Sequence, residues 1–283
     1  MKKQIILLTL LSSLFVSCEY MKYGADNLFY SGNSVLNRAK EIKTIQTGLE
    51  NVEGEYSFIV ITDYHFGSTH SDAPKLPDQR FFEWIENFPA ETKPKFCVSL
   101  GDSADTGGDE GDNQFIEFRK FTDKVESYGI KFFNVVGNHD LYNSGWEYWK
   151  KNCYPYTSFY NFKTSDISFY ALDTGTGNLG TKQMNSLKNA LKNDSMPKII
   201  MTHYPLYTDN FFFCMEDTTE RNLLIKYFAE NNAKMYLSGH LHWYEEVDYS
   251  SYKAYVLPSY RYKGKWALVK VNPAQNKYEL KVY

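Results

Sequence analysis

The sequence lacks an excess of positive charge. It contains 31 lysine and arginine residues against 34 aspartate and glutamate residues, which gives a formal net charge of −3. Proteins that bind nucleic acid usually carry a clustered basic surface, and no such footprint is apparent here. Internal repeats and low-complexity tracts are also missing. Hydrophobic residues make up 43% of the 283 positions, so the chain can bury a large core, and we expect one globular domain.

Cysteine is scarce, with four residues in the chain. Cys97 lies in an apolar, strand-like run and is predicted to be a buried free thiol. Cys153 and Cys214 could pair if the protein resides in an oxidising compartment. The sequence leaves that pairing open.

A hydrophobic run long enough to cross a membrane is absent from the N-terminus. The apolar run before Cys18 falls short of the roughly 20 residues that a transmembrane helix needs. It follows Lys2 and Lys3 and ends in small residues, which is typical of a secretory signal. The segment LFVSC resembles a bacterial lipoprotein signal. This resemblance implies that Cys18 becomes the lipidated first residue of the mature chain and its membrane anchor.

These features predict how the chain is divided. We expect residues 1–17 to be a signal peptide, residues 18–50 a tether and entry segment, and residues 51–283 the folded domain. Loss of Lys2 and Lys3 leaves 29 basic against 34 acidic residues, a formal charge of −5 for the mature chain. The expected location is the bacterial cell envelope, with the protein lipid-anchored and extracytoplasmic.

Apolar runs alternate with segments of helical periodicity through most of the chain. The predicted strands are residues 57–62, 95–100, 131–136, 197–202 and 234–238, and the predicted helices are residues 77–88, 113–129, 181–193 and 218–231. Near-continuous apolar runs indicate strands buried on both faces, and their alternation with helices predicts a largely parallel sheet. Three further strand-like segments lie after residue 250 with no helix between them. They predict a second, more antiparallel sheet packed against the first.

Polar residues of metal-binding types follow each of the five main predicted strands directly. They are Asp63-Tyr64-His65, Gly101-Asp102-Ser103-Ala104-Asp105, Gly137-Asn138-His139-Asp140, His203 and Gly239-His240-Leu241-His242. Taken singly, each has an ordinary explanation as a helix cap, a turn or a loop residue. Together they predict one site, because loops at the carboxyl ends of parallel strands converge at one edge.

The residue types in these clusters indicate the chemistry. Carboxylate, amide and imidazole groups suit divalent metals such as Zn²⁺, Mn²⁺ or Fe, and no cysteine joins the set. Two aspartates, an asparagine and four histidines exceed the ligands of one tetrahedral ion, so a two-metal centre that shares a carboxylate fits the count. His240 and His242 flank one residue, so both side chains can point at one centre, while Gly239 allows close backbone approach.

The ordered motifs DxH, GDxxD, GNHD, a histidine shortly before proline, and GHxH resemble those of the calcineurin-like metallophosphoesterases. The resemblance runs from Asp63 to His242. It implies an α/β fold, a four-layer α-β-β-α sandwich of two mixed sheets flanked by helices, with the metal site at the carboxyl-terminal edge of the strands. It further implies two metal-ligand sets that share Asp102, namely Asp63, His65 and His242 for one ion and Asn138, His203 and His240 for the other.

The same resemblance implies a reaction. A hydroxide bridging the two ions would attack a phosphoester, His139 would face the leaving oxygen, and Asp140 would orient the His139 ring or hold its proton. The purple acid phosphatases have Asp-x-Gly instead of Asp63-x-His65, and tyrosine in place of Asp105, so we do not expect an iron-tyrosinate centre. Monoesters and diesters both remain open as substrates. The alternative is a catalytically inactive envelope lipoprotein that uses this fold only for binding.

Two further features receive ordinary interpretations. Residues 175–180 match GxGxxG between a strand and a helix, but no acidic residue ends the next strand as a dinucleotide site would require. We therefore predict a plain turn there. His70 is expected to be a solvated loop residue.

Overall fold

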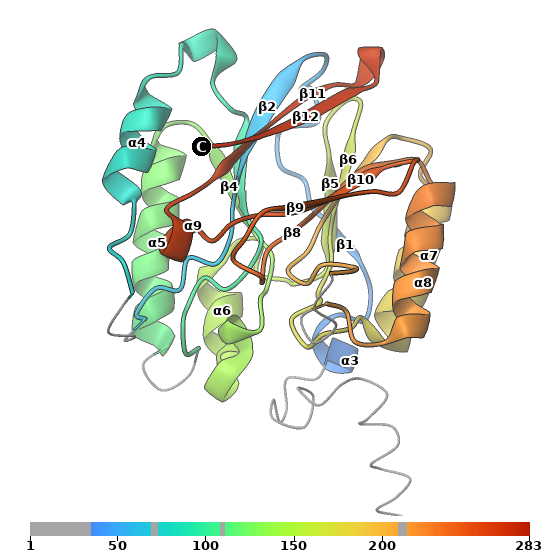
Figure 1. Ribbon diagram of the computed structural model, residues 1–283, viewed down its shortest axis with the longest axis horizontal. Helices are drawn as coiled ribbons and strands as arrows, with labels where there is room; N and C mark the ends of the chain where they lie inside the picture. The colour runs from blue at the N-terminus through green and yellow to red at the C-terminus, as the bar shows by residue number, and fades with distance from the viewer. Residues whose placement is uncertain (1–34, 69–72, 108–110, 209–213) are drawn as a thin grey trace, which may run out of the picture.

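The computed structural model describes residues 35–68, 73–107, 111–208 and 214–283 (Figure 1). Two sheets pack face to face. The five-stranded sheet has the order β12-β11-β2-β3-β4, and the seven-stranded sheet the order β1-β5-β6-β7-β8-β10-β9. The strands of the first are β2 (Tyr56–Ile61), β3 (Phe96–Ser99), β4 (Lys131–Asn134), β11 (Ala267–Asn272) and β12 (Lys277–Val282). Those of the second are β1 (Lys43–Thr44), β5 (Tyr160–Lys163), β6 (Ser168–Ala171), β7 (Lys198–Met201), β8 (Ala233–Ser238), β9 (Glu245–Asp248) and β10 (Lys253–Val256).

Helices cover the outer face of each sheet (Figure 1). On one side lie α4 (Asp78–Glu86), α5 (Gly111–Ser127) and α6 (Trp146–Asn152), and on the other α3 (Val35–Arg38), α7 (Gly180–Lys192) and α8 (Thr218–Glu230). The short helix α9 (Tyr260–Lys263) follows β10, and the 3₁₀ turns are η1 (Ala90–Thr92), η2 (His139–Ser144) and η4 (Pro273–Gln275). The predicted four-layer sandwich of two mixed sheets is confirmed.

Alternation along the strands divides the apolar side chains among three buried clusters. Phe58 and Val60 of β2 point between the sheets, whereas Ile59 and Ile61 pack under α4 and α5. A third cluster lies between the seven-stranded sheet and α7 and α8. Burial on both faces explains why these strands read as continuous apolar runs.

The predicted membership of the sheets was wrong for the C-terminal strands. β10 pairs in parallel with β8, while β11 pairs antiparallel with β2. The last strands therefore extend both sheets, and no separate antiparallel sheet forms among the described residues. The parallel runs likewise divide into β2-β3-β4 in one sheet and β6-β7-β8 in the other.

Residues 35–50 also differ from the expected tether. Val35 and Ala39 are buried in the cluster under α7 and α8. The guanidinium of Arg38 forms a buried ion pair with Asp173, with Nε and Oδ2 separated by 2.7 Å. β1 pairs with β5. The segment is held by burial and pairing, neither of which its polar sequence indicates locally.

The three described cysteines, Cys97, Cys153 and Cys214, are buried thiols. Burial raises the pKa of the Cys97 thiol well above its ordinary value, and the predicted buried free thiol is confirmed. Cys153 packs among the aromatic side chains under α5 and α6, whereas the Cys214 sulfur lies 3.1 Å from Nη1 of Arg221. The pairing of Cys153 with Cys214 does not occur.

Candidate metal centre

Both sheets contribute loops to a single site. The loops after β2, β3 and β4 come from the five-stranded sheet, and those after β7 and β8 from the seven-stranded sheet. The structure brings together all of the predicted ligands, Asp63, His65, Asp102, Asn138, His203, His240 and His242. The site therefore lies where the ends of two packed sheets meet, and not at the edge of one sheet.

The first group of donors consists of Asp63, His65 and His242. Nε2 of His65 lies 3.2 Å from Nε2 of His242, and Nε2 of His242 lies 3.4 Å from Oδ1 of Asp63. Two imidazole nitrogens and a carboxylate oxygen thus face a common point. Such convergent lone pairs fit a bound divalent cation.

The second group combines Asn138, His203 and His240. Oδ1 of Asn138 lies 3.0 Å from Nε2 of His203 and 3.1 Å from Nδ1 of His240. The two imidazole nitrogens are 3.2 Å apart. Again amide oxygen and imidazole nitrogen converge, and no thiol enters either group.

Asp102 lies between these two groups. Its Oδ2 is 3.7 Å from Nε2 of His65 and 3.3 Å from Nε2 of His203. Its Oδ1 accepts a hydrogen bond from the backbone N–H of His139, at 2.9 Å. One carboxylate therefore reaches both groups, which is the position that a bridging ligand requires.

Two of the imidazoles have their outer nitrogen held by a protein acceptor. Nδ1 of His65 lies 3.0 Å from Oδ1 of Asp105, and Nδ1 of His203 lies 2.8 Å from the carbonyl oxygen of Leu100. An acceptor at Nδ1 keeps the proton there and leaves the Nε2 lone pair for a metal. This role of Asp105 was not predicted from the sequence, although the residue is part of the GDxxD motif.

The structure corrects the predicted role of Asp140. Its carboxylate accepts hydrogen bonds from the backbone N–H groups of Ser103, Ala104 and Gly137. The His139 ring is held instead by the backbone oxygen of Asp105, 2.6 Å from Nδ1. Neighbouring side chains on the η2 turn point in different directions, so Asp140 joins the loops after β3 and β4 and does not orient the imidazole.

Electrostatic interactions cross between the sheets. Burial opposes ionisation of Asp102, but the nearby His203 and His139 hold its pKa well below the ordinary value. Burial likewise favours neutral His203, yet Asp102 and Asp63 raise its pKa to about 9. Burial and the charge of His203 lower the pKa of His240 to about 3. Burial and the charge of Asp102 raise the pKa of Asp140 to about 7.

The backbone is strained at most of the predicted ligands. Positive φ angles occur at Asp63 (53°), His65 (47°), Asp102 (54°), His240 (71°) and His242 (62°). Non-glycine residues seldom adopt this left-handed region, and such strain concentrates at functional sites. A Cβ atom at Gly239 would collide with Oγ1 of Thr62, which confirms that glycine is needed for close backbone approach.

The backbone N–H groups at the end of the turn formed by residues 175–180 already have a partner within the protein. The N–H groups of Leu179 and Gly180, at the start of α7, donate to the Glu220 carboxylate at 2.8 and 2.9 Å. An internal carboxylate occupies this helix end, which supports the plain-turn interpretation. His70 lies outside the described residues.

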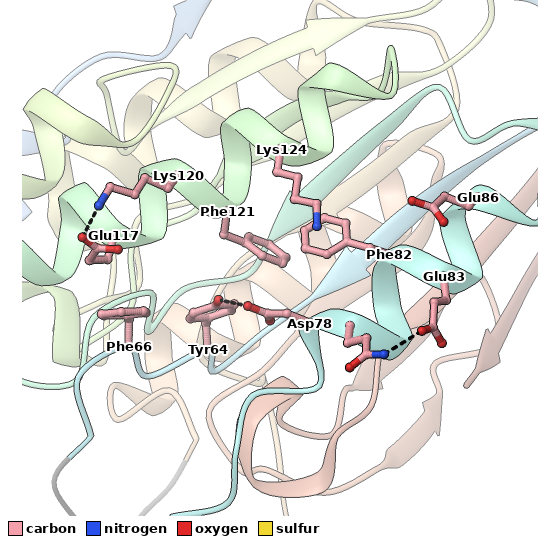
Figure 2. A pocket seen from close by; sticks show the side chains of 11 residues that line it. Tyr64, Phe66, Asp78, Phe82, Glu83, Glu86, Glu117, Lys120, Phe121 and Lys124 are labelled. Carbon is pink, nitrogen blue, oxygen red and sulfur yellow. Dashed lines mark hydrogen bonds and ion pairs between the residues drawn. The ribbon is translucent and has the colours of Figure 1, made fainter.

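A surface groove of about 520 Å³ lies between α4 and α5, apart from the metal ligands (Figure 2). The Tyr64 side chain lines it and donates to Oδ2 of Asp78 at 2.9 Å. The middle residue of the DxH motif therefore serves packing.

Within the described part of the chain, no helix combines the length and apolarity needed to span a membrane.

Comparisons with known proteins agree with this geometry. Residues 56–244 match the family model of the calcineurin-like phosphoesterases. Similar solved structures include a dimetal phosphatase from Danio rerio (TM-score 0.61, 12% identity, 78% of this chain and 94% of that one). The purple acid phosphatase PPD1 from yellow lupin, Lupinus luteus, is also similar (TM-score 0.59, 11% identity, covering 81% of this chain and 54% of that one). GAP50, the anchor in the inner membrane complex of Plasmodium, has a TM-score of 0.57 at 17% identity, covering 78% of this chain and 82% of that one.

A comparison with curated protein sequences found no match. The structural neighbours are too dissimilar in sequence to show more than the fold, but the family model covers most of the chain, including every predicted ligand. The chain therefore belongs to the calcineurin-like phosphoesterase family and is a phosphoric ester hydrolase that uses divalent metal.

Proposed function

We propose that the protein hydrolyses a phosphoester with two divalent cations, one held by Asp63, His65 and His242 and the other by Asn138, His203 and His240. The observation that carries this proposal is the Asp102 carboxylate, which lies within 3.7 Å of an imidazole from each group. Mixed oxygen and nitrogen donors favour Mn²⁺, Fe or Zn²⁺. Bound cations would neutralise phosphoryl charge and acidify water at the site.

His139 is proposed to act on the leaving group. Its Nδ1 faces the carbonyl oxygen of Asp105 at 2.6 Å, so the ring donates a hydrogen bond there and is held in one orientation. The ring packs edge-on to His65 at a centroid separation of 4.6 Å, which places it beside the metal ligands. Nε2 can then supply a proton to a departing alkoxide.

The proposal is tested by metal analysis followed by a substrate screen. The mature chain carrying Cys18→Ser should bind about two metal ions per chain and hydrolyse matched monoesters and diesters at different rates. The faster class identifies the substrate type. Absence of stoichiometric metal, together with no hydrolysis of either class, would favour the alternative of an inactive binding lipoprotein.

Lipid attachment at Cys18 is a separate part of the proposal. The basic start, the apolar run and LFVSC support it, and Cys18 itself lies outside the described residues. Cys18→Ser should release the protein from the bacterial membrane fraction and leave specific activity unchanged, because the acyl chains are proposed as the sole anchor. Cell fractionation with an activity assay measures this. A variant that stays in the membrane fraction would contradict lipid anchoring.

A further inference from the structure

A basic pocket lies beside the candidate metal centre. It has a volume of about 500 Å³ and lies between α4 and the segment around α9. Four cationic residues line it, Lys75, Arg80, Arg261 and Lys263, against one acidic residue, Glu83. The groove between α4 and α5 has the opposite balance, with four carboxylates against two lysines (Figure 2). Positive charge is therefore concentrated in the pocket of a chain that is acidic as a whole.

The cations of this pocket are largely unneutralised. Among the described residues, Lys75, Arg261 and Lys263 form no ion pair. Nε of Arg261 is buried and has no hydrogen-bond partner. Leaving a buried donor unsatisfied is costly, so an acceptor supplied by a ligand would stabilise this arrangement.

The nearby carboxylates are engaged elsewhere. Glu83 accepts a hydrogen bond from the Gln79 side chain at 2.9 Å. Asp78, which lies in the field of Arg261, accepts from the hydroxyls of Tyr64 and Tyr260 at 2.9 and 3.0 Å.

The guanidinium of Arg80 donates to the carbonyl oxygen of Gly264 and lies over the Trp266 ring. Arg80 is thus fixed in place and contributes its charge from the wall of the pocket.

Tyr262 is the wall that the pocket shares with the metal centre. Its ring stacks on His242 with centroids 5.1 Å apart and an interplanar angle of 18°, and it meets the edge of His65 at 5.4 Å. Its hydroxyl is hydrogen-bonded to Ser68 at 2.9 Å, which holds the ring in this orientation. A molecule bound at the two imidazoles would need to extend past one aromatic ring to reach the cations.

Backbone contacts fix the pocket relative to the ligand loops. The N–H of Arg261 and the hydroxyl of Ser259 both donate to the carbonyl oxygen of Asp63, at 3.3 and 2.9 Å. The N–H of Tyr262 donates to Oγ of Ser259 at 3.0 Å. Pocket and ligands therefore hold a constant separation, as a specificity site requires.

We infer that this pocket binds a second anionic group of the substrate, so that the preferred substrates are phosphoesters with a further phosphate or carboxylate beyond the scissile bond. Arginine and lysine gathered in one surface pocket favour such groups through charge-assisted hydrogen bonds. This inference rests on the proposed phosphoester hydrolysis, which supplies the position of the first phosphate.

The test compares butane-1,4-diol bisphosphate with butyl phosphate, which differ by one phosphate. The wild type should have the higher kcat/KM for the bisphosphate. In Arg261→Gln and in Lys75→Gln/Lys263→Gln, the ratio of the two kcat/KM values should fall about tenfold. Lys265→Gln is the matched control, because it removes the same charge nearby from a residue that does not line the pocket. Its ratio should equal that of the wild type.

Failure of the inference differs from failure of the proposed hydrolysis. No preference for the bisphosphate, or an equal fall in the control, would overturn the inference while hydrolysis stands. If neither ester is hydrolysed, calorimetric titration of the metal-loaded protein with the bisphosphate decides the matter. Binding that weakens about tenfold in the pocket variants and not in Lys265→Gln would uphold the subsite. Equal binding in all forms would overturn it.

Discussion

The two sheets bring unlike chemistry to the metal centre. The five-stranded sheet supplies all of the oxygen donors among the predicted ligands, Asp63, Asp102 and Asn138, together with His65. The seven-stranded sheet supplies only imidazoles, from His203, His240 and His242. Each donor group combines ligands from both sheets. A cation bound in either group would therefore connect the sheets as well as serve the reaction.

The charges of the two contributions are complementary. Nε2 of His203 lies 3.3 Å from Asp102, and Nε2 of His242 lies 3.4 Å from Asp63. These contacts explain why the pKa of each carboxyl is lowered, and that of each partner imidazole raised, despite burial that acts in the opposite direction. Loss of Asp63 or Asp102 should accordingly cost more than loss of one imidazole, because these carboxylates offset the positive charge of the site.

Asp102→Ala should have the largest effect. Removal of the carboxylate that reaches both donor groups should abolish binding of both ions and lower kcat/KM about 10⁴-fold, since metal ions supply several kcal/mol of transition-state stabilisation. His65→Ala should weaken one group and retain part of the metal. Metal content per chain, measured by atomic emission in both variants, checks the difference. Equal losses would argue against a bridging role for Asp102.

His139→Ala should have the next largest effect, and only on some substrates. General acid catalysis matters where the leaving oxygen needs a proton, so alkyl phosphoesters should lose about 10²- to 10³-fold in kcat while nitrophenyl esters lose far less. Metal content should stay at the wild-type level. Equal losses on both esters, with chemistry rate-limiting, would mean that His139 stabilises phosphoryl charge, and loss of metal would mean that it is a ligand.

Removal of metal by EDTA should destabilise the contact between the sheets. A ligand present at 100 times its Kd stabilises a protein by about 2.7 kcal/mol, which corresponds to a Tm decrease of roughly 5–10 °C for a chain of this size. Hydrogen exchange should accelerate mainly in the loops after β2, β3, β4, β7 and β8. Calorimetry and exchange mass spectrometry measure the two effects. Equal acceleration of hydrogen exchange in α7 and α8 would show that the metal does not act mainly on these loops.

The ligands could be predicted from the sequence because they lie next to strong local signals. Each follows a buried strand, and strand ends of parallel sheets converge. The partner of β10 and the burial of Val35 depend on contacts between residues far apart in the chain, which local periodicity does not encode. The direction of the Asp140 side chain could not be predicted because it depends on local backbone geometry. His139 and Asp140 are adjacent in sequence, but the 3₁₀ turn points their side chains in different directions.

Asp105→Asn should have the smallest effect, and it distinguishes most sharply between the contributions of the two sheets. His65, from the five-stranded sheet, is held by the Asp105 carboxylate, whereas His203, from the seven-stranded sheet, is held by the backbone oxygen of Leu100, which no substitution removes. An asparagine can still accept the hydrogen bond from Nδ1 of His65 but carries no negative charge, so the imidazole becomes a weaker metal ligand. Loss of such outer partners typically costs 10- to 100-fold in metal affinity, and we expect about tenfold here, confined to one of the two ions. Competitive chelator titration should therefore show one weakened site in Asp105→Asn and none in the surface control Asp123→Asn. Two equally weakened sites would indicate that Asp105 acts on the whole centre, through the backbone that also holds His139, and not through His65 alone.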